Sequence, residues 1–160
     1  MNLQAQFDQE LTKLGSGGAA TVAVDAAPRR LVCEVAERNS LAISFDRLQL
    51  ATSELAGATV ADLQRISTSL SGRLTYLMEP ISPIEIDAAA CVVQLRSNPP
   101  QKDDDGRSYY ELLVRRGGEI ALARYRKENG NARRQIPATV TREVLLRLVG
   151  DFAAALDNAS

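Results

Sequence analysis

YYELLVRRGGEIALARYR, residues 109–126, is the stretch of sequence that decides the fold. Two runs that mix apolar, aromatic and charged residues flank Gly117-Gly118. A two-residue glycine link is typical of a β-hairpin, because the tight turns that join antiparallel strands need positive φ angles. The stretch therefore predicts that residues 109–116 and 119–126 pair as antiparallel strands.

The length of this turn also predicts which residues face each other. With a two-residue turn, Leu112 faces Ala123 and Tyr110 faces Tyr125. Side chains alternate between the two faces of a strand, so each face receives a different set. The face expected on the core carries Tyr110, Leu112, Val114, Ala121, Ala123 and Tyr125. The opposite face, which mixes apolar and charged groups as a partner-facing sheet would, carries Tyr109, Glu111, Leu113, Arg115, Ile120, Leu122, Arg124 and Arg126.

Further strand patterns precede the hairpin. The apolar positions change parity after Asp46, which predicts a turn or bulge there, because a one-residue slip exchanges the two faces. They change again between Ile86 and Cys91, which is consistent with one bulged strand or with two strands. The predicted strands lie at residues 21–25, 31–36, 41–46, 74–78 (apolar on both faces, hence central) and 84–95.

Three segments have the apolar spacing of helices. The first covers residues 3–14. The second begins at Thr59, where Asp62 stands three residues on as in a capping box. The third begins at Thr141, a good N-terminal cap.

Together these elements predict an α+β fold in the order α-βββ-α-ββββ-α. We expect a mainly antiparallel sheet of about six to seven strands with the helices packed on one face, in two layers. Residues 19–157 form a single domain in this interpretation. The helix at 1–14 must pack on that domain or on a partner chain, because so short a helix is marginal alone.

This element order resembles that of the small bacterial secretion chaperones, which run helix, three strands, helix, two strands, helix. The resemblance covers the layout of most of the chain, and residues 74–126 depart from it because they hold two more predicted strands. It implies a homodimeric protein-binding module.

Composition excludes several classes of function. The 160 residues are 45% hydrophobic and 24% charged, which is ordinary for one globular domain, and they include no histidine. Cys33 and Cys91 lie in apolar strand patterns and are expected to be buried thiols; the alternative, a thiolate nucleophile, lacks an activating histidine. The run Asp103–Asp105 lacks the spacing of a calcium loop and predicts an exposed hairpin tip.

The chain also lacks a nucleotide-binding fingerprint and a nucleophile elbow. We therefore expect no enzyme activity, catalytic residue, metal or cofactor. A search for sequence motifs does not detect a site whose side chains are far apart in the sequence and come together only in the fold. The N-terminal segment lacks the features of a signal peptide, and no apolar run is long enough to cross a membrane. A cytoplasmic protein without a membrane partner is expected.

Charge concentrates around the hairpin, and this supports two hypotheses. Residues 107–134 hold eight basic and three acidic residues, although the whole chain carries a net charge of −1. The first hypothesis is a non-catalytic protein-interaction module that self-associates, as a homodimer, through the open sheet face; its interaction residues are Tyr109, Leu113, Arg115, Ile120, Leu122, Arg124 and Arg126. The alternative is an anion- or nucleic-acid-binding domain that uses Arg115, Arg124, Arg126, Arg133 and Arg134.

Overall fold

The computed structural model describes residues 2–158 as three helices packed on one antiparallel sheet of ten strands. The helices are α1 (Leu3–Leu14), α2 (Val60–Arg73) and α3 (Arg142–Asp157), with a short 3-10 turn, η1 (Ser53–Leu55). The strands are β1 (Ala20–Ala26), β2 (Arg29–Arg38), β3 (Ile43–Thr52), β4 (Ile81–Asp87), β5 (Val92–Ser97), β6 (Gln101–Lys102), β7 (Gly106–Arg115), β8 (Glu119–Glu128), β9 (Arg134–Ile136) and β10 (Ala138–Val140).

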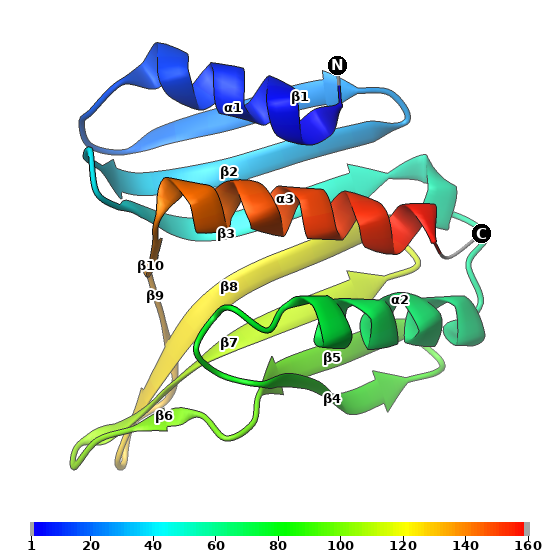
Figure 1. Ribbon diagram of the computed structural model, residues 1–160. Coiled ribbons are helices and arrows are strands. Elements are labelled where there is room, and N and C mark those ends of the chain that lie inside the picture. The colour runs from blue at the N-terminus through cyan, green and yellow to red at the C-terminus, as the bar shows by residue number, and fades with distance from the viewer. Residues whose placement is uncertain (1, 159–160) are drawn as a thin grey trace.

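The main path of the sheet is β1-β2-β3-β8-β7-β5-β4, so the first three strands join the later ones through β3 and β8. The short strands β10, β6 and β9 add to β3, β7 and β8 respectively. All three helices lie on the same side of this sheet (Figure 1). The α+β class and the antiparallel sheet predicted from the sequence are confirmed.

The helices begin where the sequence predicts. The Thr59 hydroxyl accepts a hydrogen bond from the Asp62 backbone N–H, and the Asp62 carboxylate accepts one from the Thr59 N–H, which completes the capping box. Thr141 caps α3 through the N–H of Val144. Helix α1 packs against β1 and α3 within this chain.

The hydrophobic core lies between the helices and the sheet. Its largest wholly buried side chains include Phe7 of α1, Phe45 of β3 and Phe152 of α3. Cys33 and Cys91 are both buried, and burial raises the pKa of the Cys33 thiol to about 12. Cys33 is therefore a protonated thiol at neutral pH that fills core volume.

The hairpin forms, but its predicted register is wrong by one residue. Leu112 faces Leu122 instead of Ala123, and Tyr109 faces Tyr125. The loop is Arg116-Gly117-Gly118, because Arg115 and Glu119 are the last pair of the ladder. It is a three-residue hairpin loop that ends with a glycine at positive φ, 108°.

Two contacts explain the longer loop. The Thr52 backbone N–H donates to the Gly118 carbonyl at 2.6 Å, and a Cβ at position 118 would lie 2.6 Å from the Thr52 carbonyl oxygen. The observed register also pairs the core residues Leu48 and Leu50 of β3 with Leu122 and Ile120 of β8. It buries these large aliphatic side chains in place of two alanines, which removes more apolar surface from water.

Other strand predictions are partly corrected. Residues 74–78 are a loop: the Leu74 N–H still bonds the Leu70 carbonyl at the end of α2, and Leu74 and Leu77 are buried without strand pairing. Residues 84–95 belong to two strands, the second of the two interpretations. The bulge in β3 is confirmed at Asp46, since Arg47 pairs with Glu34 while Phe45 pairs with Val35.

Candidate functional site

The face of the sheet opposite the helices is covered by no helix of the described chain (Figure 1). An uncharged row of side chains crosses this open face perpendicular to the strands, from β5 to β1. The pairing of adjacent strands places these residues next to one another in turn. We call the row the neutral stripe; it consists of Gln94, Leu113, Ala121, Gln49, Val32 and Ala23.

The side chains of the neutral stripe are short or partly buried, so none projects far from the sheet. Ala121 is only 5% exposed, whereas Leu113, Gln49 and Val32 are half-buried. At about 4.8 Å between strands, six strands span roughly 24 Å. Depletion of charged residues is typical of the core of a surface that meets another protein surface.

Charged rows border the stripe, and their charges pair within the chain. On one side, Arg115 lies 3.4 Å from the carboxylate of Glu119. Further along the same side, Arg30 pairs with Asp25 at 2.6 Å. Arg47 belongs to the row on the opposite side, and its side chain crosses the stripe: it donates to the Gln49 amide oxygen at 3.0 Å and lies 3.6 Å from Glu119. These pairs leave the border close to neutral.

On the other side of the stripe, the border centres on a buried carboxylate. The Glu111 side chain is 6% exposed. It accepts hydrogen bonds from Gln94 at 2.9 Å, from Arg96 at 3.3 Å and from Arg133. The Glu111 carboxylate also raises the pKa of Arg133, so this arginine stays charged at every relevant pH.

Two tyrosines and the same two arginines form a stack beside Glu111. The rings of Tyr109 and Tyr125 lie 6.1 Å apart at an interplanar angle of 28°. Arg96 covers the Tyr109 ring at 4.6 Å, and Arg133 covers the Tyr125 ring at 4.0 Å. The guanidiniums gain cation–π contacts in addition to their shared carboxylate, so this stack is a rigid corner of the open face.

The structure places only part of the predicted interaction set on the open face. Tyr109, Leu113 and Arg115 lie there as predicted. Ile120 and Leu122 have no exposed surface and belong to the core, which corrects their predicted position. The one-residue shift of the hairpin is the reason.

Arg124 and Arg126 follow the same shift to the helix-bearing face. Arg124 pairs with Glu79 at 3.0 Å and covers the ring of Tyr110 at 4.5 Å. Arg126 pairs with Asp103 at 3.0 Å at the tip of the β6–β7 hairpin. The predicted exposed, acidic tip is confirmed, and its carboxylate neutralises a predicted anion-binding arginine.

Sequence reasoning missed Gln94 and Arg96, the partners of Glu111. The sequence contains a pattern that indicates their position, because Gln94 and Arg96 alternate with the buried Val93 and Leu95 of β5. The hairpin pattern alone did not show that β5 lies beside β7.

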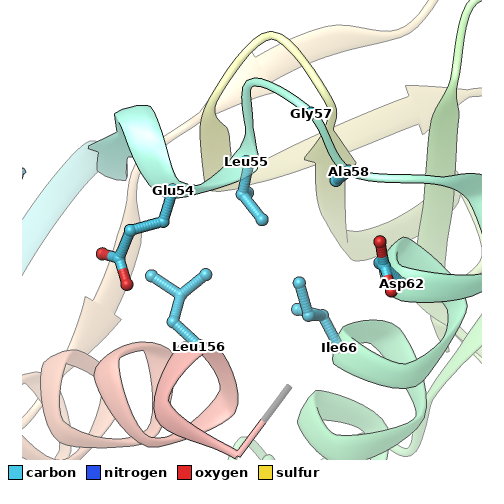
Figure 2. A pocket seen from close by; sticks show the side chains of 7 residues that line it. All are labelled: Glu54, Leu55, Gly57, Ala58, Asp62, Ile66 and Leu156. Atoms are coloured by element: carbon cyan, nitrogen blue, oxygen red, sulfur yellow. The ribbon is translucent and has the colours of Figure 1, made fainter. Parts of the chain in front are cut away.

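A hollow of about 400 Å³ lies on the helix side, between η1, the start of α2 and the end of α3. Figure 2 shows the carboxylates of Glu54 and Asp62 on opposite sides of it, with Leu55, Ile66 and Leu156 between them. A hydrogen bond from Arg29 lowers the pKa of Glu54, and the backbone hydrogen bond from Thr59 lowers that of Asp62. Both carboxylates are therefore ionised and occupied by structural partners, and neither suits proton transfer.

A second hollow, of about 320 Å³, lies between the loop after α2 and the start of α3. Its walls include Tyr76, Leu77 and Val144, and Met78 stands at its rim, 94% exposed and with a φ of 69°. This hollow is apolar and holds no charged side chain among its lining residues.

No family model, curated protein or solved structure matches this chain. Among residues 2–158, no helix is long and apolar enough to cross a membrane. The same residues bring together no group of three or more acidic or cysteine side chains that could hold a metal ion.

Proposed function

We propose that this chain is a non-catalytic protein-interaction module that self-associates through the open face of its sheet. The neutral stripe is the observation that carries this proposal. Antiparallel sheets commonly keep one wet face. Here the six residues of the central row are uncharged, and the one charged side chain that crosses the row, Arg47, is paired with Glu119.

The charge balance of the open face supports a second copy as the partner. Arg30, Arg47 and Arg115 pair with carboxylates of the same chain, so these arginines do not favour a strongly acidic partner. Two sheets pack face to face at about 10 Å when the side chains of their inner faces interdigitate, and side chains that project little from the sheet allow this approach. A second copy of the stripe satisfies both conditions.

The alternative, an anion- or nucleic-acid-binding domain, has less support. Each of the five arginines predicted to bind the anion already forms an ion pair with a carboxylate. An anion would have to displace these carboxylates, because the arginines already have a negative partner.

Sedimentation velocity over a concentration series tests the proposal. The variant Ala121→Arg places a long charged side chain in the middle of the stripe and should weaken self-association at least tenfold; Leu113→Arg is a second variant at a half-buried position. Gln9→Arg adds the same charge on the exposed side of α1 and should have no effect. A wild-type chain that stays monomeric, or a folded Ala121→Arg variant that associates as well as wild type, would overturn the proposal.

A salt titration with single- and double-stranded DNA tests the alternative. Binding through phosphate contacts must weaken steeply as salt rises. Tight, salt-sensitive binding that is lost when Arg115 and Arg134 are replaced by glutamine would favour the alternative over the proposed function.

A further inference from the structure

The two edge strands of the sheet differ in how they are protected against pairing with another strand. In β4, Pro83 lacks an N–H, the register shifts between Pro83 and Glu85, and Glu85 and Asp87 add charge. Proline, bulges and charges are the usual means by which proteins block an exposed edge. The β4 edge is therefore poorly suited to strand addition.

The β1 edge has none of these features except one charge. Its seven residues pair with β2 in an unbroken register, without proline or bulge. The single charged residue, Asp25, already pairs with Arg30 of β2. No described strand pairs with the outer side of β1.

The sequence of β1 is nearly the same in both directions from its centre. It reads ATVAVDA, and Ala23 is the middle residue. If two copies pair antiparallel about a two-fold axis at Ala23, Val22 faces Val24 of the second copy, and Thr21 faces Asp25. No like charges then face each other, and the Thr21 hydroxyl can donate to the Asp25 carboxylate.

The neutral stripe ends at Ala23, the residue on this axis. Pairing about Ala23 therefore joins the stripes of two copies end to end, on one continuous open face. The same pairing keeps the helices of both copies on one side, because the axis is perpendicular to the sheet.

Helix α1 lies over β1, so the side of α1 turned toward the β1 edge would face the second copy in this pairing (Figure 1). Arg142 of α3 holds one flank through Asp8, at 2.6 Å. By helical spacing, the flank turned away from α3 carries Glu10 and Lys13, which pair with each other at 2.9 Å. A second copy of α1 beside this flank would meet no unpaired charge from that ion pair.

We propose that the β1 edge pairs with the β1 edge of a second copy of this chain, antiparallel about Ala23. This interface is distinct from the face-to-face contact of the proposed function. With both contacts the chain forms a tetramer, and with either one alone it forms a dimer.

A cysteine at the axis tests this pairing. In the variant Ala23→Cys, the two Cα atoms lie about 4.5–5.5 Å apart across the strand pair, within the range of a disulfide. In face-to-face packing they lie about 10 Å apart, too far for a disulfide. The native cysteines are buried, so the new thiol is the exposed one.

Mild oxidation followed by a non-reducing gel should convert Ala23→Cys to a covalent dimer. Thr21→Cys is the matched control: it is exposed on the same strand and face, but each copy faces position 25 of the other, so it should stay monomeric. A mixture of Thr21→Cys and Asp25→Cys should crosslink. Equal crosslinking of Ala23→Cys and Thr21→Cys, or none by Ala23→Cys, would overturn the pairing.

The double variant Ala23→Cys/Ala121→Arg separates the two proposals. If it crosslinks as well as Ala23→Cys, the edge pairing holds without the face contact. If Ala121→Arg abolishes the crosslink, the edge does not associate by itself and the inference fails. Loss of face association alone leaves the crosslink intact.

Discussion

Leu112 and Leu113 are neighbours on β7, yet they lie on opposite faces of the sheet, and the two faces are stabilised in different ways. Leu112 has no exposed surface and lies in the core between sheet and helices, whereas Leu113 is half-buried in the neutral stripe. One face of the same strand is thus held by apolar burial. The other is held by paired charges and stacked rings around Glu111.

The two faces also differ in what they expose. Side chains such as Leu112 are wholly buried under the helices. On the open face, Arg115 and Arg47 pair with Glu119 of the same chain, and the half-buried Leu113 and Val32 leave part of their apolar surface exposed to water.

The largest expected effect comes from truncating the neighbouring leucines separately. Leu112→Ala leaves a cavity in a packed core and should reduce the free energy of unfolding by about 2–5 kcal/mol. Leu113→Ala removes a half-buried side chain from the open face and should cost less than about 1 kcal/mol. Urea denaturation of both variants, at a protein concentration where each is monomeric, measures the difference. Equal losses would mean that the open face is also covered.

A smaller effect is expected from the buried carboxylate of the open face. Glu111→Gln leaves Arg96 and Arg133 without their shared anion and should reduce the free energy of unfolding by about 1–3 kcal/mol. This loss is smaller than for a fully buried ion pair, because both arginines are partly exposed. The control Glu119→Gln removes a more exposed carboxylate from the same face and should cost about 0–1 kcal/mol. Similar results for the two variants would show that burial does not distinguish these ion pairs.

The smallest effect is expected at the exposed hairpin tip. The hydrogen bond from Arg126 lowers the pKa of Asp103 from 3.8 to about 2. A lowered pKa stabilises the folded state above the unfolded value, and this contribution disappears as pH falls through the folded value.

The melting temperature measures this contribution at the tip. Wild type should exceed Asp103→Asn slightly at pH 6, and the gap should close between about pH 4 and pH 2. A gap that widens on acidification would contradict the assigned ion pair.

Local patterns predicted much of this architecture. The caps at Thr59 and Thr141 are confirmed because capping depends on residues three positions apart. The bulge at Asp46 is confirmed because a change of apolar parity is visible within one strand. Such features depend on contacts close in sequence, so the sequence alone contains their cause.

Two features of the candidate site could not be predicted from local sequence patterns. The face of β8 depends on a loop one residue longer than the glycine pair suggests, and Thr52 of β3 fixes that loop through Gly118. The environment of Glu111 depends on Arg96 and Arg133, which come from strand β5 and from the loop before β9.

The sequence by itself determined the class of fold, the helix starts, the hairpin and the alternation of faces along each strand, because these follow from spacing within a few residues. Only the tertiary structure decided which face of β8 is buried, how the arginines are neutralised and where the neutral stripe runs. These depend on the order of strands in the sheet, which brings together residues far apart in the chain, and burying Ile120 and Leu122 against β3 outweighs the turn expected from two glycines.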